Sequence, residues 1–301
     1  MTQGRTTVIV NGAAGGGRCR EAADGALSRL RALGIEADVR YTERAGHASE
    51  LAKSAYDAGC RDFVSVGGDG TTYEVVNGLF PRPEGHDDPI RLGILPLGTG
   101  NSFLRDFEVM STNDALDALT RRRSRSVDVV RVKHRDGLLH YINLLTIGFV
   151  TNAGDLTNRR FKSLGEAGYL LAAMVCIARL KSSTDPFRLD DGDVDRRPAP
   201  FLVFSNSQFT GGSFHIAPHA DPTDGELDVI RAVPMNRGAF VKNLLAVYKG
   251  KHVEDPRVEE KRAKRVTFES PREHLVMLDG EIMPLTLESL EVMPGALEIW
   301  A

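Results

Sequence analysis

The sequence has 301 residues, of which 42% are hydrophobic and 26% charged, and its formal net charge is −3. This length and composition predict a soluble protein with room for two domains, and the slightly acidic balance excludes bulk affinity for nucleic acid. Cys19, Cys60 and Cys176 are scattered and odd in number, which favours reduced thiols in a cytoplasmic protein over a disulfide framework or a zinc site. The most apolar segment, 169–180, is too short to cross a bilayer.

Residues 1–128 alternate strand-like and helix-like segments, the pattern of a parallel sheet with crossover helices. We expect strands at 6–10, 35–41, 63–66 and 90–95. The helices after the first two strands should end at Gly34 and Gly59, because glycine readily adopts the backbone conformation that closes a helix. This part of the chain is therefore predicted to be an α/β domain.

The stretch 64–78 breaks an apolar run with glycines around one acid and then resumes a helical pattern. Gly67, Gly68 and Gly70 let the backbone expose successive N–H groups, and the following helix adds the positive end of its dipole, so the turn is suited to phosphate. Asp69 would repel a bare phosphate, and we expect it to act through a divalent cation or a substrate proton. A tight structural turn would account for the same pattern.

Two further polar, glycine-bearing turns follow predicted strands. One is 11–15, Asn-Gly-Ala-Ala-Gly, which lacks the Lys-Ser/Thr pair of a Walker A loop, and the other is 96–101, Pro-Leu-Gly-Thr-Gly-Asn. Because the carboxyl ends of parallel strands meet at one edge of a sheet, we expect the three turns to converge on one phosphorylated ligand.

The alternation of strand-like and helix-like segments ends near Ser126, and short apolar strand-like segments follow. The expected strands lie at 127–132, 141–147, 201–205, 227–233, 265–268, 275–278 and 285–290, with helices at 164–180 and 238–249. We predict a β-rich second domain over 129–290, and the pattern leaves open a return of the last ten or so residues to the first domain.

Four blocks of sequence occur in a distinctive order along nearly the whole chain. They are Gly67-Gly68-Asp69-Gly70-Thr71 with Glu74-Val75-Val76-Asn77-Gly78-Leu79, then Leu92 to Asn101 with Phe103 and Arg105, then Asp221, Asp224-Gly225 and Leu227-Asp228-Val229, and last Leu278-Asp279-Gly280-Glu281. Their order and spacing resemble the diacylglycerol kinase catalytic family, which includes YegS-like bacterial lipid kinases, sphingosine kinases and ceramide kinases. The Gly-Gly-Asp-Gly turn alone is shared with NAD kinases and phosphofructokinases.

The resemblance implies a fold and an activity. The fold is an NAD kinase- or phosphofructokinase-like α/β domain, a sandwich-like β domain and an active-site cleft between them. The activity is transfer of the γ-phosphoryl group of ATP, with Mg²⁺, to a hydroxyl of diacylglycerol or of a sphingoid or ceramide lipid. Two alternatives stay open: a kinase for a soluble substrate, of the NAD kinase type, and a lipid-binding homologue with weak catalysis. Ser102, where most members carry an acid, motivates the second alternative.

The resemblance also implies site residues. Those expected to bind the nucleotide are Asn11, Gly12, Ala13, Ala14, Gly15, Thr42, Gly68, Asp69, Gly70, Thr71, Thr72, Tyr73, Glu74, Thr99 and Glu281. Asp69 and Asp279 are the expected catalytic residues, Asp69 acting through Mg²⁺ and Asp279 as the general base. Asp221, Asp224 and the backbone carbonyl of Glu226 would hold a structural Mg²⁺, although a plain Asp-Gly turn also explains that loop.

Basic clusters at 121–125, 159–162 and 261–265, together with the apolar helix near 169–180, suggest peripheral attachment to an anionic membrane surface. We therefore expect a cytoplasmic protein that meets its lipid substrate at a membrane, with no nucleic-acid partner. A homodimer is left open.

Overall fold

The computed structural model describes residues 6–17, 19–32, 34–82, 88–98, 101–121, 123–161 and 165–301. Thr99, one of the expected nucleotide-binding residues, lies outside these ranges, as do Arg122 and Lys162 of the basic clusters.

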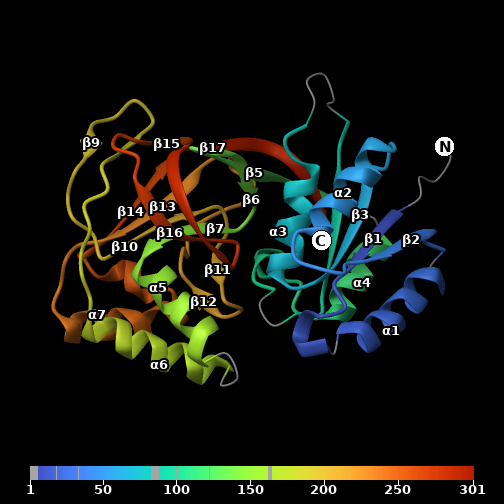
Figure 1. Ribbon diagram of the computed structural model, residues 1–301, viewed down its shortest axis with the longest axis horizontal. Helices are drawn as coiled ribbons and strands as arrows, with labels where there is room; N and C mark the ends of the chain where they lie inside the picture. Colours follow the sequence, from blue (N-terminus) through green and yellow to red (C-terminus); the bar gives the residue numbers. More distant parts are fainter. Residues whose placement is uncertain are drawn as a thin grey trace.

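One half of the molecule is a parallel sheet in the order β2-β1-β3-β4, accompanied by helices (Figure 1). The strands are β1 (Thr6–Val10), β2 (Ala37–Tyr41), β3 (Asp62–Gly67) and β4 (Arg91–Pro96). The helices are α1 (Cys19–Ala32), α2 (His47–Asp57), α3 (Asp69–Leu79) and α4 (Thr112–Arg121), with 3-10 turns η1 (Ala14–Gly17) and η2 (Phe103–Phe107). The predicted α/β domain is confirmed. Apolar residues of its central strands lie in the core because helices cover the sheet.

The other half is rich in antiparallel strands, and most of its sheet follows the order β14-β13-β10-β7-β16-β17. Its strands are β5 (Ser124–His134), β6 (Gly137–Tyr141), β7 (Leu144–Gly148), β8 (Phe187–Leu189), β9 (Val194–Asp195), β10 (Phe201–Ser205), β11 (Phe209–Thr210), β12 (Phe214–His215), β13 (Leu227–Ala232), β14 (Val258–Ala263), β15 (Arg265–Phe268), β16 (Glu273–Leu278) and β17 (Glu281–Trp300). The predicted β-rich character is confirmed.

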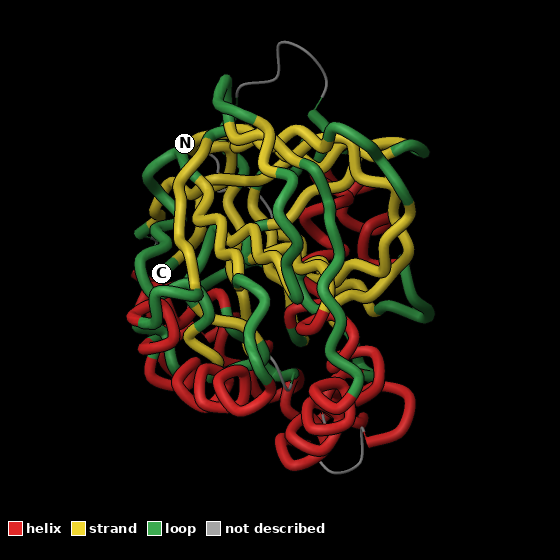
Figure 2. The backbone as a smooth tube through the Cα atoms, turned by 90° about the vertical axis from the view of Figure 1, so that its left-hand side faces the viewer, coloured by secondary structure: helices red, strands yellow, loops and turns green. Residues whose placement is uncertain are grey.

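Helices lie at one end of this β-rich half, below the strands in Figure 1. They are α5 (Phe149–Leu156), a π-helical turn η3 (Thr157–Phe161), α6 (Gly165–Ala178), α7 (Arg237–Ala246) and the 3-10 turns η5 (Val247–Lys249) and η6 (Lys251–Glu254). In the perpendicular view many helices lie along the lower edge, outside the strands (Figure 2). None of the helices in the described ranges combines the length and apolar character needed to cross a membrane.

Strands β5 and β17 run through both halves. They pair antiparallel from Leu287 opposite His134 to Trp300 opposite Ser124, and the end of β17 also pairs in parallel with β4. We expected a short strand ending at residue 290. The structure differs because irregularities in the ladder absorb the Pro-Gly pair at 294–295, where Gly295 has φ +60°. The predicted domain boundary after residue 128 falls inside β5 and stays a prediction.

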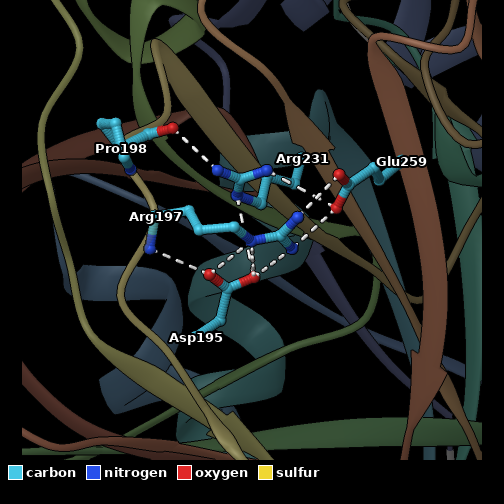
Figure 3. Close-up of polar contacts among 5 residues, drawn as sticks. All are labelled: Asp195, Arg197, Pro198, Arg231 and Glu259. Atoms are coloured by element: carbon cyan, nitrogen blue, oxygen red, sulfur yellow. Dashed lines mark hydrogen bonds and ion pairs between the residues drawn. The ribbon is translucent and has the colours of Figure 1, made fainter.

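An ion-pair network fastens the β8–β9 hairpin to the edge of the β-rich sheet (Figure 3). The Arg197 guanidinium contacts Asp195 at 2.5 Å and Glu259 at 2.8 Å. Arg231 lies behind it with its side chain 5% exposed, 3.8 Å from Asp195 and 3.5 Å from Glu259, and donates a hydrogen bond to the Pro198 carbonyl. The arginines hold the pKa of Asp195 down, to about 2, with Arg197 as the main cause. Asp195 thus anchors the hairpin through ion pairs.

Arg231→Met should lower the free energy of unfolding by about 3 kcal/mol, because it removes one partner of a buried charge network and leaves the others unbalanced. Urea denaturation followed by circular dichroism measures this change. The control is Lys133→Met in the same half, which breaks an exposed ion pair to Glu288 and should change stability very little. Equal free energies of unfolding for the two variants would show that Arg231 does not stabilise the protein through this network.

Candidate active site

The three glycine-bearing turns meet at the carboxyl ends of β1, β3 and β4. The Asn11 N–H donates to the Val66 carbonyl at 3.0 Å, and the N–H groups of Leu97 and Gly98 donate to the Gly67 carbonyl at 3.0 and 2.8 Å. A Cβ atom at Gly98 would overlap the backbone of Gly68, so the close contact of the second and third turns requires glycine there. These contacts bring together turns that are far apart in the sequence.

A cavity of about 1050 Å³ opens beside these turns and extends into the β-rich half. The expected site residues that line it are Asn11, Ala13, Ala14, Gly15, Thr42, Gly68, Asp69, Gly70, Thr71, Glu74, Asp279 and Glu281. Three expected nucleotide-binding residues are not among the described residues of its wall: Gly12, Thr72 and Tyr73. The Thr72 hydroxyl instead bonds Ser65 at 2.9 Å, and Tyr73 packs in the apolar core of the β-rich half.

Asp69 is held by Ser102, the residue that replaces the usual acid. The backbone N–H of Ser102 donates to the Asp69 carboxylate at 3.0 Å and its hydroxyl donates at 3.2 Å. The same hydroxyl oxygen accepts the N–H of Gly212 from the β-rich half at 2.9 Å. Burial raises the pKa of Asp69 to about 6, and the bonds from Ser102 oppose this rise. Ser102 therefore orients Asp69 and ties it to the opposite wall of the cleft.

Asp279 is a buried carboxylate at the tip of the β16–β17 hairpin, with φ +47° and 4% exposure. Its Oδ1 accepts the N–H groups of Asn143 and Leu144 at 3.0 and 2.9 Å, and its Oδ2 accepts that of Ile142 at 3.0 Å. Burial raises the pKa of Asp279 to about 7, the charge of Asp69 adds to this rise, and the backbone N–H groups oppose it. This carboxylate therefore lies inside the molecule and borders the cavity.

Glu74 has a supporting position beside the nucleotide turns. Its two carboxylate oxygens accept the N–H groups of Gly46 and Ala48 at 2.8 and 3.0 Å, at the start of α2. This contact holds the segment 42–48 against α3. Glu74 therefore shapes the wall that Thr42 lines.

Arg105 supplies positive charge to a wall that is otherwise rich in acids. It lies in η2, three residues after Ser102, with its guanidinium 5.7 Å from the ring centre of Phe209. Among the described residues, the arginines and lysines of the wall are Arg44 and Arg105. Arg44 is already paired with Glu50 at 2.7 Å. In the sequence, Arg105 stands out only as a member of the same family block as Phe103.

The far end of the cavity is apolar and was not predicted. Its wall includes Phe149, Val150, Phe201, Phe214, Ile216, Met235, Phe240, Leu244, Val247, Val258, Met277 and Ile282. These side chains come from α5, α7 and several strands, so no single stretch of sequence signals the pocket. The cavity thus joins a polar end, where the three glycine-bearing turns meet, to an apolar end.

The loop 221–226 carries the expected structural metal site. Asp221 accepts hydrogen bonds from the N–H and hydroxyl of Thr223 at 3.0 and 2.7 Å, and Arg262 contacts the carboxylates of Asp224 and Glu226. Within the described ranges, no group of three or more His, Cys, Asp or Glu is arranged to hold a metal. Arg262 already neutralises part of the loop, and the Mg²⁺ at this position stays a prediction.

Replacing Ser102 with alanine should raise the pKa of Asp69 above about 6, because a hydrogen bond that stabilises its charged form is lost. A pH titration of the carboxyl signals by NMR measures the shift. Ser183→Ala is the matched control, since the Ser183 hydroxyl donates to Asp185 at 2.7 Å outside the cavity. An unshifted Asp69 in the Ser102 variant would rule out the orienting role of that hydroxyl.

Comparisons with known families and proteins agree with this geometry. Residues 5–132 match the diacylglycerol kinase catalytic domain, and residues 143–301 match the YegS C-terminal NAD kinase beta sandwich-like domain. A diacylglycerol kinase from Mycobacterium tuberculosis is 30% identical over 302 residues, which cover 98% of this chain and 94% of the relative. One from Staphylococcus aureus is 27% identical, covering 92% of this chain and 86% of the relative.

The fold is also shared with solved structures. A candidate diacylglycerol kinase from Bacillus anthracis str. Sterne superposes with a TM-score of 0.78 at 25% identity, covering 100% of this chain and 96% of that chain. Both halves of the molecule are therefore covered by these matches. The chain belongs to the diacylglycerol kinase catalytic family.

Proposed function

We propose that the protein is an ATP-dependent lipid kinase that transfers the γ-phosphoryl group to a hydroxyl of a lipid such as diacylglycerol. The proposal rests on one continuous cavity, in which glycine-bearing turns and acids lie at one end and an apolar wall at the other. The names of the Mycobacterium tuberculosis and Staphylococcus aureus relatives support a kinase of this class.

The polar end suits a nucleoside triphosphate. Backbone N–H groups of the turns and the start of α3 favour phosphate, and the Asn11 side chain braces the turn by donating to the Thr71 hydroxyl at 3.1 Å. Arg105 is placed to neutralise phosphate charge that develops during transfer. Phosphoryl transfer asks a protein mainly for positioning and charge compensation, and these groups supply both.

The same end fits a divalent cation. Asp69 is a buried acid with a raised pKa, and its described partners are hydrogen-bond donors of Ser102 without positive charge. A bound Mg²⁺ would offset the charge of Asp69 and of the phosphates. Asp69 would hold the ion.

Asp279 is the proposed general base. As a carboxylate it can take the proton of the acceptor hydroxyl while the oxygen–phosphorus bond forms and the bond to the ADP leaving group breaks. Its three backbone donors fix its orientation toward the cavity. The apolar end would hold the acyl or alkyl chains of the acceptor, which favours a lipid over the soluble substrate of an NAD kinase.

Asp279→Asn should depress kcat by about 10²- to 10⁴-fold while ATP affinity stays nearly unchanged, because the substitution keeps the shape and removes the base. The wild-type rate should rise with pH through about 7, since only the ionised Asp279 accepts a proton, and the variant should lose this dependence. Rate measurements at fixed ATP from pH 5 to 9 test both expectations. Loss of ATP binding with an unchanged rate per bound ATP would instead favour Asp69 as the base.

Asp69→Ala should abolish phosphoryl transfer without unfolding the protein. Purified wild type and variant are incubated with labelled ATP, Mg²⁺ and separate acceptors: diacylglycerol, a sphingoid base, ceramide and NAD. Chromatography of the products identifies the acceptor, and circular dichroism checks the fold of the variant. Labelling of NAD alone would support the soluble-substrate alternative, and no labelling of any acceptor would support a homologue with weak catalysis.

A further inference from the structure

Helix α7 forms part of the cavity wall on one side and carries exposed apolar residues on the other. Phe240 and Val247, at the two ends of this region, border the apolar end of the cavity. Leu245 and Tyr248 are 57% and 41% exposed. One short segment therefore separates the expected lipid pocket from the outside of the molecule.

Helix α6 packs beside α7 and adds to the same kind of surface. Ala173 and Ile177 are buried in one apolar cluster with Phe240. Leu171, Met174 and Val175 are 48%, 51% and 42% exposed. Among the described residues, five of the eight exposed large hydrophobic side chains belong to α6 and the α7–η5 segment, so the apolar exposure is concentrated there.

Basic residues outnumber acids in and next to these helices, although α6 carries Glu166 in its first turn. The segment 235–251 contains Arg237, Lys242, Lys249 and Lys251 and no acid, and 168–181 likewise contains basic residues and no acid. Lys242, Lys249 and Lys251 are exposed and have no ion-pair partner within the described ranges. Positive charge without compensation beside exposed apolar side chains is complementary to an anionic lipid surface.

Three residues of the basic clusters expected to meet a membrane are neutralised within the protein. Arg159 pairs with Asp155 at 2.9 Å, Arg262 contacts two acids of the loop 221–226, and Arg265 pairs with Glu291 at 3.2 Å. Such intramolecular pairs leave less net charge for an external anionic surface. The α7 segment places lysines that have no ion-pair partner among the described residues beside the exposed side chains of Leu245 and Tyr248.

We propose that the exposed face of α6 and α7, defined by Leu171, Met174, Val175, Lys242, Leu245, Tyr248 and Lys249, docks on the surface of an anionic lipid bilayer. The proposal rests on the lipid-kinase function proposed above. Docking there brings the bilayer next to the helix whose inner side lines the apolar cavity, so the acceptor can enter with little exposure of its chains to water. The helices lie below the strands of the β-rich half in Figure 1.

The test compares two face variants with wild type. One is the apolar triple variant Leu171→Gln, Met174→Gln and Leu245→Gln, and the other is the charge variant Lys242→Gln and Lys249→Gln. The control is Met110→Gln with Leu138→Gln, which changes residues 61% and 42% exposed outside the face. Each protein is sedimented with vesicles of phosphatidylcholine alone or with phosphatidylglycerol, at low and high salt, and its oligomeric state is measured by analytical ultracentrifugation.

The apolar variant should bind both kinds of vesicle at least about tenfold more weakly. The charge variant should lose roughly fivefold per lysine on anionic vesicles, and this loss should vanish at high salt. The control should bind as wild type does. Wild-type vesicle binding by both face variants would overturn the proposal. A change from dimer to monomer with unchanged vesicle binding would also overturn it, and would assign the face to a second copy of the chain.

Kinase assays separate this proposal from the proposed function. With a short-chain acceptor dispersed in solution, the face variants should keep wild-type turnover, and with the same acceptor in anionic vesicles they should lose it in proportion to binding. If wild type phosphorylates no lipid yet binds vesicles through this face, the kinase function fails and the docking surface stands. If wild type is active in both assays and the face variants match it with vesicles, the docking surface fails and the kinase function stands.

Discussion

The site depends on a strand that belongs to both halves of the molecule. β17 starts at the hairpin that carries Asp279, pairs along β5, and ends beside β4, the strand that leads into the third glycine-bearing turn. A hydrogen-bonded ladder is stiff compared with a linker, although irregularities interrupt the register of this one. The position of Asp279 relative to the phosphate turns is therefore set by backbone pairing, and side-chain contacts across the cleft only refine it.

The turn η2 and the residue before it make contacts across the cleft. Ser102 links Asp69 to Gly212, and Asp106 accepts the N–H of Gln208 from the β-rich half at 3.2 Å. Burial raises the pKa of Asp106 to about 7, so this tie strengthens as the carboxyl ionises. One short turn, with the residue before it, thus orients Asp69, presents Arg105 and joins the two walls of the cavity.

Buried acids at the centre of the cavity have a physical cost that a ligand can offset. Burial raises the pKa values of Asp69 and Asp279 above those of free carboxyls, and the charge of Asp69 adds to the rise at Asp279. A cation at Asp69 would offset this charge and lower both pKa values. The apolar end of the cavity has the opposite character, since a hydrocarbon chain bound there would remove its apolar side chains from water. A ligand with a phosphate end and an apolar end matches both needs.

The sequence alone was sufficient for the local features. The turns at 11–15 and 67–71 could be predicted because glycine freedom and the strand-turn-helix pattern depend on neighbouring residues, and the family blocks pointed to Asp279. The tertiary structure decided the rest. The donors that hold Asp279 lie 135 to 137 residues away, the partner of Asp224 is Arg262, and the apolar pocket is assembled from α5, α7 and separate strands. Such contacts depend on the register of strands and the packing of helices, and no short sequence pattern records where two distant segments meet.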